Sequence, residues 1–236
     1  MDNPFIREEM ALGAVAMEKL RGAHVIVFGI GGVGSYTAEA LARAGIGGIT
    51  LVDNDTVGMS NLNRQLCALH STLGQPKAEV MAARIRDINP ECRARAIVRL
   101  YQEESKELFF DRPYSYVADC IDLVSCKLSL IQTAMERRIP VISALGTGNK
   151  TDGSLFQVTD ISKTQGCPLA RVIRRELRSR GILHHKVVFS PEEALTPAPM
   201  EAPPPGRRSI PASLSWVPSA AGLMMAGAIV QDLIRE

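Results

Sequence analysis

The chain has 236 residues, a formal net charge of +2 and 46% apolar residues, enough for one large α/β domain with a substantial core. Its five cysteines are an odd number, which argues against a complete disulfide framework, and they form no CxxC pair, which argues against a zinc site. The longest apolar run, at 220–230, is shorter than the roughly 20 residues of a membrane span, and no secretory signal opens the chain. We therefore expect a soluble cytoplasmic protein without a membrane span.

Short apolar runs alternate with helical patterns through the first 145 residues. The predicted strands lie at 24–28, 49–52, 116–118 and 141–143, and the predicted helices at 33–44, 77–88 and 127–135. This alternation predicts an α/β, Rossmann-like, doubly wound and mostly parallel sheet with helices on both faces.

The alternation is expected to end at Gly146. A strand is predicted at 155–158, a basic amphipathic helix at 167–180, and an exposed loop where prolines crowd 191–211. The closing helix at 219–234 is rich in small and apolar residues, which favours close packing, in a subunit interface among other places.

A glycine motif follows the first strand. Residues 29–34 read Gly-Ile-Gly-Gly-Val-Gly, which satisfies GxGxxG between a strand and a helix. Gly29 permits a tight turn, Gly31 lets a phosphate approach the backbone, and Gly34 allows close helix packing. Asp53, at the end of the second strand, is placed to accept ribose hydroxyls. The motif predicts a nucleotide site, with a ligand-free glycine turn as the alternative.

Polar residues after Asp53 distinguish ATP from NAD. Asp55, Asn61, Arg64 and Lys77 lie within the next 25 residues. Hydride transfer needs no cations beside the phosphates, whereas attack on the α-phosphorus of ATP does. The cluster favours phosphate chemistry, although Arg64 or Lys77 taken singly could be ordinary surface charges.

Five motifs in order resemble the adenylation core of the ubiquitin-activating-enzyme-like superfamily. They are the GxGGxG loop, the DxD at 53–55, SNLNRQ at 60–65, GQPK at 74–77 and the segment Asp119-Cys120-Ile121-Asp122. Further segments, among them 3–5, 88–92 and 157–161, resemble one branch of that superfamily over nearly the whole chain. That branch is the bacterial tRNA threonylcarbamoyladenosine dehydratases.

The resemblance implies a role for each matching residue. Gly29, Gly31, Gly32, Gly34 and Asp53 would bind the nucleotide, with Asp55, Asn61, Arg64 and Lys77 around its phosphates. Asp122 would lie beside the α-phosphate and hold Mg²⁺; a helix cap is the alternative for this residue. Arg7 resembles an arginine that, in related enzymes, reaches the ATP of the neighbouring subunit. The implied catalytic set is Arg64, Lys77, Asp122 and Arg7, and the implied assembly is a homodimer.

The resemblance also implies a reaction. ATP would activate the threonyl carboxylate of threonylcarbamoyladenosine in tRNA, and the carbamoyl nitrogen would close a five-membered ring with loss of AMP. Residues 1–160 would form the ATP-binding adenylation domain, and 161–236 a C-terminal extension. The rival is an activator of a ubiquitin-like sulfur-carrier protein, against which the missing CxxC pairs count. A non-catalytic nucleotide-binding adaptor and an NAD oxidoreductase are weaker alternatives, and a sulfur-transfer partner protein is left open.

Two features of the C-terminal extension each have two possible interpretations. Cys167, at the start of the basic helix, is either a nucleophile or a small apolar cap packed under the helix. The helix itself either contacts RNA phosphates or presents a solvated face, and His184, His185 and Lys186 would extend its positive patch. The arginines concerned are Arg171, Arg174, Arg175, Arg178 and Arg180.

Overall fold

One seven-stranded sheet organises the computed structural model, which describes residues 3–198, 200 and 210–235. The strand order is β3-β2-β1-β4-β5-β7-β6, and every neighbouring pair is parallel except β6 with β7. The strands are β1 (His24–Phe28), β2 (Gly48–Val52), β3 (Arg93–Ile97), β4 (Tyr116–Asp119), β5 (Val141–Ala144), β6 (Gln157–Asp160) and β7 (Lys186–Phe189).

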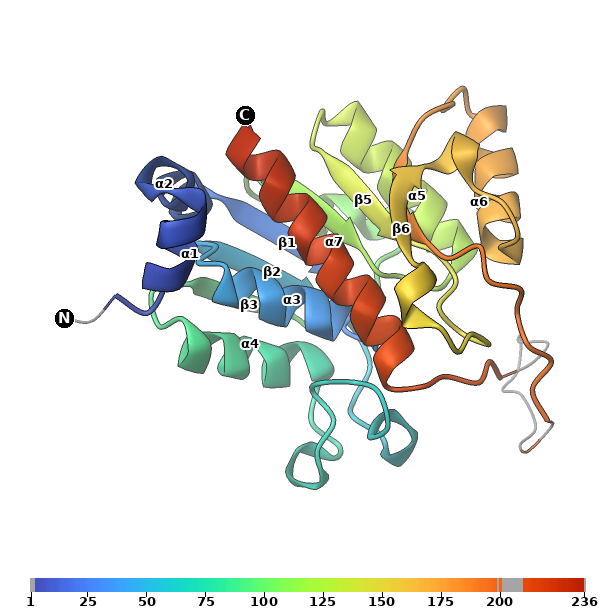
Figure 1. The fold of residues 1–236 in the computed structure, drawn as a ribbon, viewed down its shortest axis with the longest axis horizontal. Coiled ribbons are helices and arrows are strands. Elements are labelled where there is room, and N and C mark those ends of the chain that lie inside the picture. Colours follow the sequence, from blue (N-terminus) through green and yellow to red (C-terminus); the bar gives the residue numbers. More distant parts are fainter. Residues whose placement is uncertain (1–2, 199, 201–209, 236) are drawn as a thin grey trace.

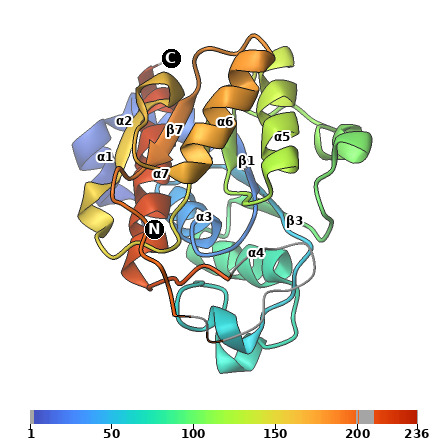
Figure 2. The ribbon, with the colours of Figure 1, turned by 90° about the vertical axis from the view of Figure 1, so that its right-hand side faces the viewer.

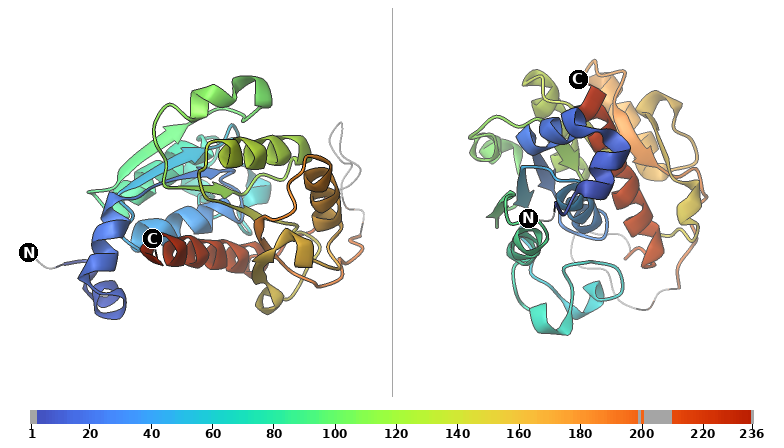
Figure 3. Two further views of the ribbon diagram at one scale, coloured as in Figure 1. Left: turned by 90° about the horizontal axis from the view of Figure 1, so that it is seen from above. Right: turned by 60° about the vertical axis from the view of Figure 1, so that its left-hand side comes forward.

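Helices cover both faces of this sheet (Figures 1 and 3). One face packs on α3, α4 and α7, and the other on α5 and α6, because alternate strand residues supply apolar side chains to each side. Two short helices, α1 and α2, precede β1. The helices are α1 (Ile6–Leu12), α2 (Ala14–Gly22), α3 (Gly34–Arg43), α4 (Lys77–Ile88), α5 (Val124–Glu136), α6 (Pro168–Ser179) and α7 (Trp216–Arg235).

The α/β class and the parallel sheet that the alternation predicted are confirmed. Three predictions were displaced by two or three residues, and one of them is the helix expected at 127–135, which begins at Val124. The strand expected at 155–158 begins at Gln157, because 153–155 form a 3-10 turn, and the closing helix begins at Trp216 rather than 219. The sheet also continues past Gly146, since β7 inserts between β5 and β6. Figure 2 shows β7 beside α6, on which it packs. Residues on both sides of position 160 therefore share one sheet.

The closing helix α7 crosses the sheet beside α3 (Figure 1). Gly222 allows this approach, because a Cβ there would lie 2.4 Å from the Val33 carbonyl oxygen, and Thr37 Oγ1 donates to the Gly222 carbonyl at 3.1 Å. Of the described helices, α7 alone is long and apolar enough to cross a membrane, by length and composition only, with a mean hydropathy of 1.4. Half of that stretch is buried, as in a helix of a protein core.

The proline-rich loop predicted at 191–211 is described only in part. Its positions up to 198, with 200, 210 and 211, have no helix or strand, and 199 and 201–209 lie outside the described residues. The described ends meet at Asn149, whose carbonyl accepts from the Leu195 amide and whose amide donates to the Ala212 carbonyl, both at 2.8 Å.

Candidate active site

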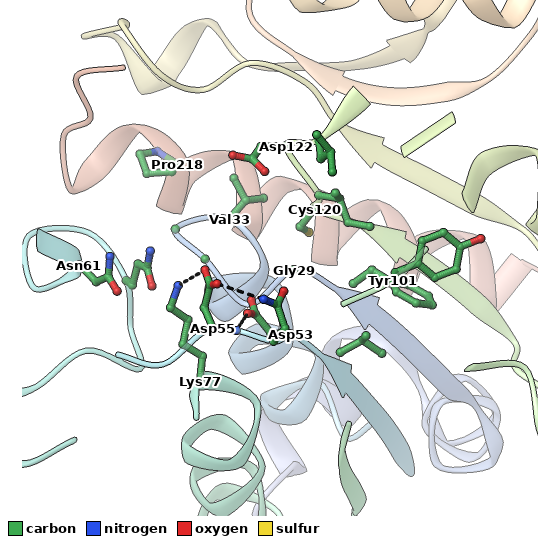
Figure 4. Close-up of a pocket in the computed structure, with 18 of the residues that line it drawn as sticks. Gly29, Val33, Asp53, Asp55, Asn61, Lys77, Tyr101, Cys120, Asp122 and Pro218 are labelled. Atoms are coloured by element: carbon green, nitrogen blue, oxygen red, sulfur yellow. Dashed lines mark hydrogen bonds and ion pairs between the residues drawn. The ribbon is translucent and has the colours of Figure 1, made fainter. Parts of the chain in front are cut away.

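A cavity of about 500 Å³ opens at the carboxyl ends of β1, β2 and β4. The strand order reverses between β1 and β4, the position at which open parallel sheets bind ligands. Its walls come from the glycine loop, the segment after β2, the loop between β4 and α5, and the segment before α7 (Figure 4). All the predicted residues except Arg7 come together here: the lining includes Gly29, Gly31, Gly32, Asp53, Asp55, Asn61, Arg64, Lys77 and Asp122, and Gly34 closes the glycine loop.

The glycines of the loop serve different needs. Gly29 has φ +85, and a Cβ there would meet the Cys120 carbonyl oxygen at 2.8 Å. A Cβ on Gly34 would lie 1.8 Å from the Gly29 carbonyl oxygen, so this position accepts only glycine. A Cβ on Gly31, by contrast, would have no protein atom closer than the Gln65 side-chain nitrogen at 3.9 Å. Protein packing therefore explains Gly29 and Gly34, whereas Gly31 keeps space open towards the cavity.

Asp53 joins the glycine loop to the segment after β2. One carboxylate oxygen accepts from the Ile30 amide at 2.6 Å, and the other from the Asp55 amide at 2.8 Å. Burial raises the pKa of Asp53, while these backbone donors and Lys77 oppose the rise. The carboxylate is thus fixed at the edge of the cavity, where ribose hydroxyls could donate to it.

Lys77 brings a buried ammonium group to one wall of the cavity. Its side chain is only 6% exposed, and Nζ lies 3.0 Å from an Asp55 carboxylate oxygen whose side chain is 61% exposed. The Lys77 amide also donates to the Asp55 carbonyl at 3.0 Å. Asp55 therefore positions Lys77 beneath the glycine loop (Figure 4).

The SNLNRQ loop forms the wall next to Lys77. Asn61 accepts from the Gly58 amide through its side-chain oxygen at 3.0 Å, which shapes the turn. Arg64 donates to the Ser60 carbonyl at 2.7 Å and to the Asn63 side chain at 3.0 Å, and burial lowers its pKa. Its guanidinium has no carboxylate partner within the described part of the chain, so it is available to an anionic ligand.

Asp122 is exposed to the cavity from the loop that follows β4. It lies across the glycine loop from Asp53 and Lys77 (Figure 4). The residue at the N-cap of α5 is Leu123, one position beyond Asp122. Among the described residues no three metal-binding side chains cluster, so an ion here would rely on one carboxylate and on ligand oxygens. Mg²⁺ binds in this way, through one or two carboxylates and substrate phosphates.

Two parts of the wall were not predicted from the sequence. Arg99, Leu100 and Tyr101 follow β3, a strand that had not been predicted because the run 93–97 alternates arginine with alanine. Ser213 and Pro218 come from the segment before α7. The aromatic residues around Tyr101 could have suggested a buried segment there. No local pattern, however, connects Ser213 with Asn63, which lies 150 residues earlier and donates to the Ser213 carbonyl.

Arg7 lies outside this cavity. It is exposed on α1 and lines a separate hollow with the carboxyl ends of α3 and α4, which is the opposite edge of the sheet. Within its own chain it is therefore not part of the site.

Cys167 matches the cap that the sequence left as one alternative. It is the buried N-cap residue of α6, and its sulfur accepts from the Ala170 amide at 3.5 Å. It does not line the cavity.

The predicted extension of the basic patch was wrong for two of its three residues. His185 is buried, because it directly precedes β7, an interior strand that lies between β5 and β6, and Lys186 is paired with Asp232 of α7 at 2.6 Å. On α6 itself, Arg174 donates to Thr164 and Arg175 pairs with Glu176. The remaining arginines are exposed without a carboxylate partner among the described residues: Arg171, Arg178 and Arg180.

Comparisons with known proteins show the family of this chain. A ThiF family domain matches residues 6–235. The chain is 45% identical to the tRNA threonylcarbamoyladenosine dehydratase of Bacillus subtilis, over all of this chain and 96% of that protein. The E. coli tRNA N6-threonylcarbamoyladenosine dehydratase, TcdA, solved in complex with AMP and with ATP, superimposes with a TM-score of 0.89 at 37% identity, over 98% of this chain and 94% of that one. The chain therefore belongs to the ThiF family, in the branch of the tRNA threonylcarbamoyladenosine dehydratases.

Proposed function

We propose that this protein is an ATP-dependent dehydratase that acts on threonylcarbamoyladenosine in tRNA by adenylating the threonyl carboxylate. The observation that carries the proposal is the convergence of Asp53, Lys77, Arg64 and Asp122 around one cavity at the strand switch point. The B. subtilis and E. coli relatives named for this activity support it.

The lining residues support one orientation of ATP along the cavity. Asp53 would accept the ribose hydroxyls, which leaves the segment 99–101 beside the base and the glycine loop beneath the phosphates. Lys77 and Arg64 would then lie where the negatively charged carboxylate attacks the α-phosphorus of the negatively charged ATP and displaces pyrophosphate. Fixed cations offset this repulsion without reorganising.

The second step needs little from the protein. The oxygen lost from the carboxylate leaves with AMP, and the neighbouring carbamoyl nitrogen attacks the activated carbonyl and releases a proton. Because the ring closes within one molecule, proximity supplies much of the rate. This agrees with the buried position of Cys167, which removes the obvious protein nucleophile.

Magnesium fits the donors present. Asp122, which lines the cavity, would hold the ion together with phosphate oxygens. When bound, Mg²⁺ would neutralise part of the charge on the phosphates.

The outer face of α6 is the surface that we assign to tRNA. Arg171, Arg178 and Arg180 are exposed, and the start of α6 adjoins Gly146, since a Cβ there would lie 3.5 Å from the Cys167 sulfur. The next residue, Thr147, lines the cavity. Replacing the three arginines by alanine should reduce the salt slope of tRNA binding by roughly 2 to 3 units if each contacts one phosphate. Arg86→Ala, on α4, is the control, and an unchanged slope would exclude this face.

Arg7 would act in a homodimer. Its distance from its own cavity fits an arginine that completes the site of a second copy. Mixing Arg7→Ala with Lys77→Met subunits should then partly restore activity, because one of the two sites in a mixed dimer is intact. Failure of the mixture to exceed either variant alone would remove this role.

A reducing, cytoplasmic location agrees with five free cysteines.

The decisive experiment incubates the purified protein with Mg²⁺-ATP and tRNA that bears threonylcarbamoyladenosine. Release of AMP together with loss of the mass of one water from the nucleoside is the expected result. Pyrophosphate exchange that depends on a ubiquitin-like protein, with no change in the tRNA, would overturn the proposal in favour of carrier-protein activation.

A further inference from the structure

A fully buried polar network lies behind the loop that carries Asp122. Asp119, the last residue of β4, accepts from Lys127 Nζ at 2.7 Å and from Ser143 Oγ at 2.6 Å through one carboxylate oxygen. Lys127 and Asp119 are both 0% exposed. Ser143 is the neighbour of Asp119 in the register of β4 and β5, and its Oγ lies 2.8 Å from His185 Nε2. The network therefore joins α5 to β4, β5 and the start of β7.

The proton positions follow from the donors. The Ser143 hydroxyl has one hydrogen, which it gives to the Asp119 carboxylate, so its oxygen accepts from His185 Nε2–H. Burial and the nearby Lys127 lower the pKa of His185 to about 3, which keeps the ring neutral. Nδ1 is then a bare acceptor, and it is buried with no hydrogen-bond partner among the described residues. His185 thus donates one hydrogen bond, from Nε2 to Ser143, which in turn donates to Asp119.

The other carboxylate oxygen of Asp119 reaches the active-site loop. It accepts from the Ile121 amide at 3.1 Å, which sets the turn at 120–123. Cys120, Ile121 and Asp122 of this turn line the cavity. A buried ion pair is costly to desolvate and contributes little to stability compared with apolar packing, so its position directly behind the site calls for another explanation.

We propose that Lys127, Ser143 and His185 are positioning residues, which act through Asp119 to hold the 120–123 turn and so place Asp122 in the cavity. The role given to Asp122 rests on the proposed function. The geometry of the turn does not depend on it. The network orients the carboxylate, and the carboxylate fixes the backbone amide of Ile121.

The chain offers a matched control. Thr50 is 0% exposed in the middle of β2, and its hydroxyl lies 2.9 Å from His24 Nε2, which is the same kind of hydroxyl–imidazole pair. Thr50→Val and Ser143→Ala each remove one buried hydroxyl from such a pair, so they should lower thermal stability to a similar extent. Of these two hydroxyl groups, only that of Ser143 contacts Asp119.

The test compares the two variants well below their melting temperatures. Ser143→Ala should raise the hydrogen-exchange rate of the Ile121 amide about tenfold over Thr50→Val and lower kcat about tenfold, with the KM for ATP changed less than about twofold. Lys127→Met should produce larger changes in the same direction if it folds. Equal exchange rates in the two variants would overturn the proposal. Because exchange needs no turnover, that result is distinct from failure of the wild type to convert tRNA, which would refute the proposed function alone.

Discussion

The two glycines Gly31 and Gly34 allow the nucleotide role of the loop to be separated from its role in folding. Gly31→Ala places a methyl group 3.9 Å from the nearest protein atom, and the backbone at this position has no positive φ. The variant should fold with a stability within about 1 kcal/mol of wild type, since alanine also reduces the entropy of the unfolded chain. Gly34→Ala would place a methyl group 1.8 Å from the Gly29 carbonyl oxygen, an overlap that forces the loop and α3 apart. Its cost should reach about 3 kcal/mol or more.

Affinity for ATP should show a different pattern. The methyl group of Gly31→Ala occupies the space through which a phosphate approaches the loop amides, so Kd should rise about 10- to 100-fold, or about 1.4 to 2.7 kcal/mol. Calorimetric titration with ATP and thermal unfolding of the same samples measure both quantities. A Gly31→Ala protein that binds ATP like the wild type would refute the placement of the phosphates over this loop. A Gly34→Ala protein of unchanged stability would contradict the packing argument.

Three further predictions concern single side chains. Lys77→Met should lower kcat about 10² to 10³-fold, yet cost only about 0 to 1 kcal/mol of stability, because the exposed Asp55 can be rehydrated. Steady-state kinetics should show a smaller loss of kcat for Asp55→Asn, which keeps the cation. Equal losses in the two variants would mean that the ion pair matters more than the ammonium group. Cys167→Ala should keep full turnover and lose about 1 kcal/mol of stability with its N-cap contact, so an inactive but folded variant would restore the nucleophile hypothesis. Burial and neighbouring arginines lower the pKa of His24 to about 4 from 6.5, so the unfolded state binds the extra proton between these values and stability falls as the pH drops through that window. In urea unfolding, His24→Gln should remove about one proton from that pH slope, and a slope equal to that of the wild type would contradict the assignment.

Local sequence patterns determined the nucleotide end of this protein. A strand that stops at glycines, a helix with small residues and a carboxylate at the next strand end are linked by short-range geometry, so the loop at 29–34, Asp53 and the helix Lys77–Ile88 lie where they were predicted. The segment after β2 is equally local, and therefore Asp55, Asn61, Arg64 and Lys77 could be placed around one cavity from the order of the residues alone. The strand β3 was missed because its alternating arginines resemble a surface segment.

Only the tertiary structure decided what the C-terminal third contributes. Strand β7 enters the sheet between β5 and β6, which carries His185 into the core, although adjacent histidines and a lysine in sequence suggest a surface patch. The segment before α7 brings Ser213 and Pro218 to the cavity, and the order of the strands brings Ser143 beside Asp119. These contacts join residues far apart in the chain, and their positions depend on strand order and on the packing of α7 against α3. Hydrophobic periodicity reports which face of an element is buried, but not which neighbour covers it, so the sequence alone could not provide them.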